Sequence, residues 1–338
     1  MNKTNKTKNL LIDSMFDRDI NNPKKEVVIP APPPWRRKNS TKDISEDDSI
    51  KVKDYNPYMP LSDKEIKIVN AALILRRPIL ITGKPGSGKS SLAEAVRKKL
   101  TLGDKVLHWR ITTQSKFTDG LYSYDALSRL QDIQFGDKDE DGNIIHEKIN
   151  KYLSLEALGE AFTSKKQRVV LIDEIDKSQI DLPNNLLHLF EENEFEIPEL
   201  KRIGGEFWHN DNKKEYNVVN DGMVKCDIET FPLIIMTSNG ERDFPPAFLR
   251  RCLHLEMGLP DAEQLSDIVT KHFEAIDETI DAKDLADIIA LFVDKRDKSE
   301  HDYLSTDQLL NFVYLRHKEN IDIKDEEIQN GILRNLFG

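Results

Sequence analysis

A short glycine-rich segment has residue types that suit the binding of phosphate groups. Residues 83–90 read GKPGSGKS and fit the pattern GxxxxGK[ST]. The glycines of such a loop allow backbone N–H groups to turn toward an anion, and a following helix adds the positive end of its dipole. Lys89 occupies the position that reaches the β- and γ-phosphates, and the Ser90 hydroxyl occupies the position that binds Mg²⁺. The segment therefore predicts a binding site for a nucleotide and magnesium.

Two acidic residues follow a second apolar segment, residues 168–175, which reads RVVLIDEI. Such a run is typical of a buried parallel strand with acids at its carboxyl end. We expect Asp173 to hold the water shell of Mg²⁺ and Glu174 to polarise an attacking water. The alternative is a strand that ends in a solvated acidic turn. The predicted nucleotide-binding residues are Gly83, Lys84, Pro85, Gly86, Ser87, Gly88, Lys89, Ser90, Ser91 and Asp173, and the predicted metal ligands are Ser90 and Asp173.

A third apolar run, residues 231–239, reads FPLIIMTSN and ends in Asn239. The amide of Asn239 is a candidate for orienting water against the γ-phosphate, although asparagine also commonly closes strands in turns. Residues 245–252 then predict a short helix that ends in Arg250 and Arg251, where cations also suit the helix dipole.

The elements around these residues are those that one parallel sheet with flanking helices requires. Residues 78–82 predict a buried strand before the loop, and Leu92, Val96 and Leu100 recur at helical spacing after it. Residues 62–75 predict a helix opened by a capping box, residues 105–111 a second strand, and residues 253–257 a fifth.

Two stretches exceed what a minimal phosphate-loop core needs. Residues 112–166 contain an acidic turn at 136–142, predicted to be a solvated loop tip because calcium-loop spacing is not met, and a helix at 154–162. Asp181 is expected to cap a helix with Pro183 in its first turn. Residues 195–229 predict a β-hairpin with long loops.

The two ends of the chain differ in composition. Every segment from residue 260 onward predicts helix, which makes a compact helical domain over 260–338. Residues 1–55 are polar, with a proline cluster followed by Trp35, and predict either a docking segment anchored by Trp35 or a disordered leader.

The overall composition predicts a cytoplasmic protein. Of the 338 residues 38% are hydrophobic and 32% charged, with no apolar run of membrane-spanning length and no signal peptide. Cys226 and Cys252 lie far apart and form no metal-ligand spacing, which favours a reduced compartment. The net charge of −11 argues against a broad nucleic-acid surface.

Four features in order, GKPGSGKS, VVLIDEID, a strand ending in TSN, and AFLRR, make the chain resemble an AAA+ ATPase. The segments FEIPEL and DGLYSYDALSRLQD resemble stretches typical of the MoxR-like branch. The resemblance implies an α/β fold, a phosphate-loop parallel sheet of order 5-1-4-3-2 with a C-terminal helical lid. It implies an AAA+ domain over 56–259 with insertions near 112–166 and 195–230, and a lid over 260–338.

The resemblance also implies ATP hydrolysis with Mg²⁺ in a homo-oligomer, usually a hexameric ring. By position, residues 83–90 are Walker A, Asp173 and Glu174 are Walker B, and Asn239 is sensor 1. Arg251 falls at the place of the arginine finger, with Arg250 or Arg242 as alternatives. MoxR-like proteins commonly act with von Willebrand A-domain partners, so the leading hypothesis is a remodelling or regulatory ATPase that acts on a protein.

One departure from the family pattern keeps other hypotheses open. Many AAA+ proteins carry an arginine at the start of the third lid helix, but residues 304–309 read LSTDQL here. The second hypothesis is therefore a slowly hydrolysing, nucleotide-gated switch or scaffold of a multi-component conflict system. The third is an NTP-driven DNA motor like the McrB group, which the acidic net charge disfavours.

Overall fold

A computed structural model describes residues 61–135, 149–204, 206–209, 212, 214–275, 278–298, 304–319 and 331–333. The predicted tail with Trp35, the acidic turn at 136–142 and most of the last predicted helix lie outside these residues. The chain divides into two compact units. One holds residues 61–84 and 89–258, and the other holds residues 85–88 and the chain from residue 259 on.

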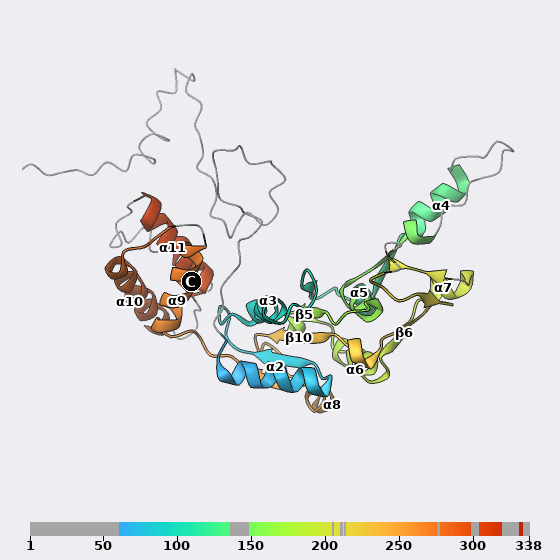
Figure 1. Cartoon of the computed structure of the whole chain (residues 1–338), viewed down its shortest axis with the longest axis horizontal. Helices are drawn as coiled ribbons and strands as arrows, with labels where there is room; N and C mark the ends of the chain where they lie inside the picture. The colour runs from blue at the N-terminus through green and yellow to red at the C-terminus, as the bar shows by residue number, and fades with distance from the viewer. Residues whose placement is uncertain are drawn as a thin grey trace, which may run out of the picture. The chain divides into compact units, whose positions relative to one another are not determined.

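The first unit is built on a parallel sheet, as the apolar runs predict. Its five strands lie in the order β11-β1-β10-β5-β2, and every neighbouring pair is parallel. Figure 1 labels two of them, β5 and β10. The strands are β1 (Ile79–Thr82), β2 (Leu107–Arg110), β5 (Val169–Asp173), β10 (Leu233–Ser238) and β11 (Leu253–Glu256). Thr82 pairs with Ser238, so β1 and β10 end together at the carboxyl edge, the edge where Asp173 also ends β5.

Helices cover this sheet, and their boundaries follow from local sequence signals. The helix α2 (Asp63–Leu75) begins after Ser62, whose side chain forms the predicted capping box with Glu65. The helix α3 (Lys89–Leu100) packs on β5 and β10, and α5 (Ala157–Thr163) packs on β2 and β5. The helix α6 (Leu182–Glu192) follows the turn η5 (Ile175–Lys177). Asp181 occupies the predicted N-cap position with Pro183 in the first turn, but its side chain makes no cap hydrogen bond.

The first insertion differs from its prediction at one boundary. It contains η3 (Phe117–Gly120), β3 (Tyr122–Tyr124), α4 (Ala126–Phe135), η4 (Ile149–Lys151) and β4 (Leu153–Leu155). The helix expected at 154–162 begins only at Ala157, because residues 153–155 alternate buried and exposed and pair with β3. Gly159 of α5 lies so close to the Leu121 carbonyl that a Cβ atom there would clash.

The second insertion is larger than the predicted hairpin, and that prediction is wrong. It forms a four-stranded antiparallel sheet of order β6-β9-β8-β7, with the helix α7 (Pro198–Ile203) between two of the strands. The strands are β6 (Glu194–Glu196), β7 (Glu206–Phe207), β8 (Val219–Asn220) and β9 (Met223–Lys225). Pro198 in the first helical turn explains why the FEIPEL segment leaves the strand for a helix. The turn η7 (Ile228–Thr230) then leads into β10, and α8 (Pro246–Leu249) follows it.

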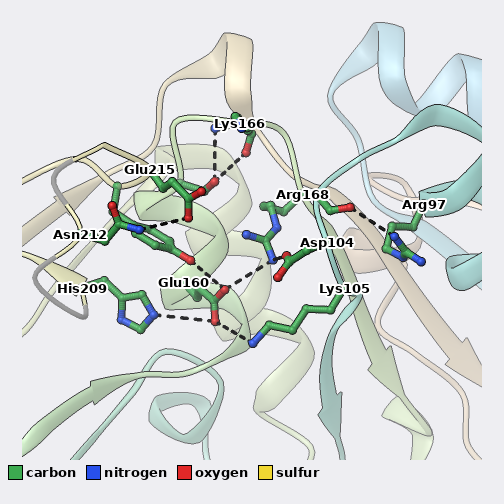
Figure 2. Close-up of polar contacts among 12 residues, drawn as sticks. Arg97, Asp104, Lys105, Glu160, Lys166, Arg168, His209, Asn212 and Glu215 are labelled. Carbon is green, nitrogen blue, oxygen red and sulfur yellow. Dashed lines mark hydrogen bonds and ion pairs between the residues drawn. The ribbon is translucent and has the colours of Figure 1, made fainter. Parts of the chain in front are cut away.

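A buried polar cluster joins this second insertion to the amino-terminal edge of the central sheet. Glu160 of α5 is 9% exposed and accepts a hydrogen bond of 3.0 Å from the Tyr216 hydroxyl (Figure 2). Arg168, directly before β5, lies 3.5 Å from the Glu160 carboxylate, and Lys105, before β2, lies 3.7 Å from it. His209 lies 3.8 Å away on the other side. The cluster thus fastens two sheets together at the edge opposite Asp173.

The described part of the second unit contains three long helices. They are α9 (Ala262–Glu274), α10 (Ala282–Lys298) and α11 (Thr306–Glu319), with a capping box between Asp261 and Gln264 at the start of α9. Their apolar faces share one core that includes Leu265, Ile288 and Leu309. None of the helices in the described part of the chain combines the length and the apolar character needed to cross a membrane.

We expect Tyr216→Phe to destabilise the protein, because it removes the hydrogen bond to Glu160 in the cluster of Figure 2. The substitution removes the hydroxyl donor from a buried carboxylate, so the free energy of unfolding should fall by about 1–3 kcal/mol. Urea unfolding followed by tryptophan fluorescence measures it. The matched control is Tyr152→Phe, whose hydroxyl donates to the more exposed Asp132, where water can replace it. Equal losses in the two variants would contradict a special role of the buried cluster.

Candidate functional site

The loop between β1 and α3 has the backbone conformation that its glycines allow. Gly86 and Gly88 have φ angles of +81° and +85°, in the left-handed region where a side chain is strained. Thr82 ends β1 and Lys89 begins α3, so the loop lies between a strand and a helix amino terminus. This is the arrangement in which loop amides and the helix dipole favour an anion.

Lys89, the first residue of α3, is a buried charged side chain at the end of this loop. It is 7% exposed, and its ammonium donates hydrogen bonds to the carbonyl oxygens of Gly83 at 2.7 Å and Lys84 at 3.0 Å. Burial lowers the pKa of Lys89, and the negative charges of Asp176, Asp173 and Glu174 oppose this effect. The ammonium is therefore hydrogen-bonded to its own loop and lies in the negative electrostatic potential of these three acids.

The first predicted acid, Asp173, ends β5 and contacts the loop helix directly. The Ser90 hydroxyl donates a hydrogen bond of 2.8 Å to Asp173 Oδ1. The Thr237 hydroxyl donates to the same oxygen at 2.5 Å, and His108 Nε2 lies 3.4 Å from Oδ2. Burial alone would raise the pKa of Asp173, but hydrogen bonds from His108, Thr237 and Ser90 outweigh it and lower the pKa to about 2. Asp173 is therefore a carboxylate at neutral pH.

The pair of Ser90 and Asp173 offers hard oxygen ligands of the kind that Mg²⁺ prefers. Among the described residues there is no group of three or more His, Cys, Asp or Glu side chains that could hold a metal ion. The donor set thus fits a magnesium ion that takes its remaining ligands from water and phosphate oxygens, as Mg²⁺ sites commonly do.

The second predicted acid, Glu174, has an unusual backbone. Its φ of +61° and ψ of +47° place it in the left-handed region, which a non-glycine residue adopts at an energetic cost. Its N–H donates to the Thr237 hydroxyl at 2.9 Å, which holds the turn in place. The Glu174 carboxylate lies 3.0 Å from the Lys177 ammonium and remains partly exposed.

Thr237 is a site residue that our sequence analysis missed. Its single hydroxyl donates to Asp173 and accepts from the Glu174 N–H, so it bridges the two acids from the neighbouring strand. The only signal in the sequence is the pair of hydroxyl residues, Thr237 and Ser238, that ends the apolar run before Asn239. That signal has no meaning until the pairing of β10 with β5 is known.

Asn239 directly follows β10, the strand that lies between β1 and β5. Its backbone N–H donates to Asp176 Oδ2 at 2.9 Å. The residue therefore leaves the sheet between the loop strand and the strand of the two acids.

The three arginines lie after β10 and bond to other parts of their own unit. Arg251 forms an ion pair with Glu191 and donates to the Ala247 carbonyl, and Arg250 donates to the Pro246 carbonyl. Arg242 donates to the Ser178 carbonyl at 2.7 Å. In the described structure, none of the hydrogen bonds or ion pairs of these arginines reaches Lys89, Asp173 or Glu174.

Comparison with known families gives a match over residues 78–252, which is just over half of the chain. The matching family is the AAA domain of the dynein-related subfamily. The chain belongs to this AAA family. An AAA domain binds and hydrolyses ATP, so the predicted resemblance to AAA+ ATPases is confirmed at this level. A search of curated proteins gave no match.

The bridging role of Thr237 in this AAA domain predicts that Thr237→Val is destabilising. Valine cannot donate to Asp173 or accept from Glu174, so the free energy of unfolding at neutral pH should fall by about 1–3 kcal/mol. The pKa of Asp173 should rise from about 2 toward its ordinary 3.8. Urea unfolding and NMR titration of the carboxyl group measure the two effects.

The pH dependence of this effect has a definite sign. A carboxyl with a lowered pKa stabilises the fold above its ordinary pKa and loses that contribution as the pH falls toward 2. The difference between the native chain and Thr237→Val should therefore be largest near neutral pH and shrink below about pH 4. Thr237→Ser keeps the hydroxyl and serves as the control. A valine variant that behaves like the serine variant would contradict the bridge.

Proposed function

We propose that the chain is an oligomeric AAA+ ATPase that remodels or regulates a protein partner, with ATP and Mg²⁺ bound at residues 83–90 and Asp173. The observation that carries this proposal is the hydrogen bond between Ser90 and Asp173. It joins the start of the loop helix to the end of β5, so the loop and the two acids belong to one site. An acidic strand end unrelated to the loop would not make this contact.

The loop and Lys89 bind the triphosphate in this proposal. The backbone N–H groups of residues 83–90, Pro85 excepted, meet phosphate oxygens, with the help of the α3 dipole. The ammonium of Lys89 exchanges its present carbonyl partners, Gly83 and Lys84, for β- and γ-phosphate oxygens. Mg²⁺, when bound, neutralises charge that develops on these oxygens. Ser90 and the ionised Asp173 are the residues that would hold it.

Glu174 and Asn239 act on the attacking water. The Glu174 carboxylate orients the water and accepts its proton as the water oxygen bonds to the γ-phosphorus. The bond from that phosphorus to the β,γ-bridging oxygen breaks, which leaves ADP and phosphate. Asn239 orients the same water from the neighbouring strand. The backbone of Glu174 is strained and is held by the Thr237 hydroxyl. It fixes the position from which the Glu174 side chain extends.

Arg251 is our first choice for the arginine finger that reaches the site of a neighbouring copy. It is exposed at the end of α8, where its ion pair with Glu191 leaves a solvent-accessible guanidinium. A surface ion pair of this kind contributes little free energy, so a phosphate can replace it. Arg250 remains an alternative, whereas Arg242 is already engaged by Ser178 in its own chain. Hydrolysis would then depend on assembly.

The same proposal assigns the chain to the MoxR-like branch. It also includes a hexameric ring and a von Willebrand A-domain protein as the partner. The strand order β11-β1-β10-β5-β2 corresponds to the 5-1-4-3-2 order of that resemblance, and the helices α9 to α11 correspond to its lid. The two insertions at residues 112–166 and 195–230 have their own antiparallel strands, which supports the branch. We expect this protein to work in the cytoplasm.

The slow switch or scaffold is the second candidate, and one observation favours it. The helix α11 begins at Thr306, and residues 304–309 hold no arginine to sense the γ-phosphate. ATPase turnover that rises with protein concentration, as rings form, speaks for the remodelling ATPase. A monomer that retains ATP speaks for the switch. Comparing ATP with GTP, with and without DNA, tests the McrB-like motor.

Glu174→Gln should lower ATP turnover about 100-fold or more while ATP binding is retained, because the amide cannot accept the proton of the water. Phosphate release and titration with a fluorescent nucleotide measure the two quantities. Glu192→Gln is the control on an exposed glutamate of α6. Equal turnover in Glu174→Gln and the native chain would end the catalytic assignment. Lys89→Ala should instead lose nucleotide binding.

A mixing experiment tests the finger. Arg251→Ala and Lys89→Ala should each be inactive alone, since one lacks the finger and the other the phosphate site. At a 1:1 ratio in random rings, about one quarter of the interfaces pair an intact site with an intact finger, so activity should return to roughly that fraction. Absence of rescue at every ratio would rule out Arg251 in trans, and the same experiment with Arg250→Ala tests the alternative.

A further inference from the structure

Asp176 is a buried acid of the same region to which the proposed mechanism gives no role. It lies in the turn η5, two residues beyond Glu174, and is 5% exposed. Its Oδ2 accepts two backbone hydrogen bonds, from the N–H of Asn239 at 2.9 Å and from that of Glu241 at 3.2 Å. A single carboxylate oxygen thus holds the segment that follows β10.

A second pair of residues connects the same two segments. Arg242 donates from Nη1 to the Ser178 carbonyl at 2.7 Å and from Nη2 to the Ser178 hydroxyl at 3.1 Å. Ser178 is itself 5% exposed. We call Asp176, Ser178 and Arg242, with the backbone of residues 239–241, the strand-end clamp. It joins the turn after β5 to the loop after β10 through four hydrogen bonds.

The environment of the other oxygen of Asp176 favours a role beyond stability. Oδ1 is buried and has no hydrogen-bond partner in the described part of the chain. A buried carboxylate oxygen without a donor costs free energy, whereas an uncharged residue would avoid that cost. Gly240 lies between the two amides that Asp176 holds, has a φ of +79° and no side chain to pack, and its own N–H donates to the Ser238 hydroxyl at 3.0 Å.

We propose that Asp176 is a positioning residue that sets where Asn239 lies relative to Glu174. Thr237 fixes the two strands where they end, and the strand-end clamp fixes the segments just beyond them. Glu174 lies between these two fastenings and the backbone of Asn239 belongs to the second, so the two residues are held as one unit. The inference rests on the proposed ATPase function, in which both residues orient the same water.

Asp176→Ala, Asp176→Asn and Arg242→Ala test the proposal in the full chain. We expect Asp176→Ala to lower kcat about 10- to 100-fold, because a small displacement of a positioned group has an effect of that size, with the affinity for ATP changed less than threefold. Asp176→Asn should stay within about threefold of the native kcat, since its amide oxygen can still accept both N–H groups. Asp227→Ala, which removes a local carboxylate–amide bond to the Glu229 N–H just before β10, is the control.

Hydrogen–deuterium exchange gives a readout independent of turnover. The amides of Asn239 and Glu241 should exchange at least 10-fold faster in Asp176→Ala and near the native rate in Asp176→Asn. Native turnover in a folded Asp176→Ala, or equal loss of kcat in Ala and Asn variants, would overturn the positioning role. Should Asp176→Ala not fold, Arg242→Ala carries the same comparison, and native turnover in it would count against the clamp.

The failure of the proposed function gives a different pattern. A native chain without ATP turnover rejects the ATPase and, with it, any role of Asp176 in that reaction. Turnover in the native chain that Glu174→Gln abolishes and Asp176→Ala leaves intact rejects the positioning role alone.

Discussion

The hydrogen bond between Ser90 and Asp173 is the contact on which the functional interpretation of this protein depends. The two residues are 83 positions apart, and only the parallel order of the sheet brings them together. Because β1 and β5 run in the same direction, both end at the carboxyl edge. That edge presents the loop amides, a lysine and two acids to one region of space, as ligands in open α/β sheets require.

The strand β10 organises the polar groups at this edge into one site. It lies between β1 and β5, so its polar end can touch both sides. Thr237 holds the two acids, and Asp176 holds the loop that carries Asn239. Hydrogen bonds from His108, Thr237 and Ser90 keep Asp173 ionised against the effect of burial, which is the state that a magnesium ligand needs.

The opposite edge of the sheet has another task. There the Glu160 cluster fastens the second insertion to the amino-terminal ends of β2 and β5, with a buried carboxylate surrounded by donors (Figure 2). At both edges, buried charges have partners of opposite charge or hydrogen-bond donors. At the amino-terminal edge these contacts attach the second insertion, whereas at the carboxyl edge the charged groups remain accessible to a ligand.

The sequence by itself determined the local features: the phosphate loop, the apolar strands with acids at their ends, the capping box at Ser62 and membership of the AAA+ group. These follow from residue types at fixed short spacing, which the backbone translates directly into structure. It did not determine the four-stranded sheet in the second insertion or the strand β4, because short strands are defined by partners distant in the chain. It also gave no role to Thr237, Asp176 or Glu160. A buried hydroxyl or carboxylate acquires its meaning from the group it touches, and only the tertiary structure decides which group that is.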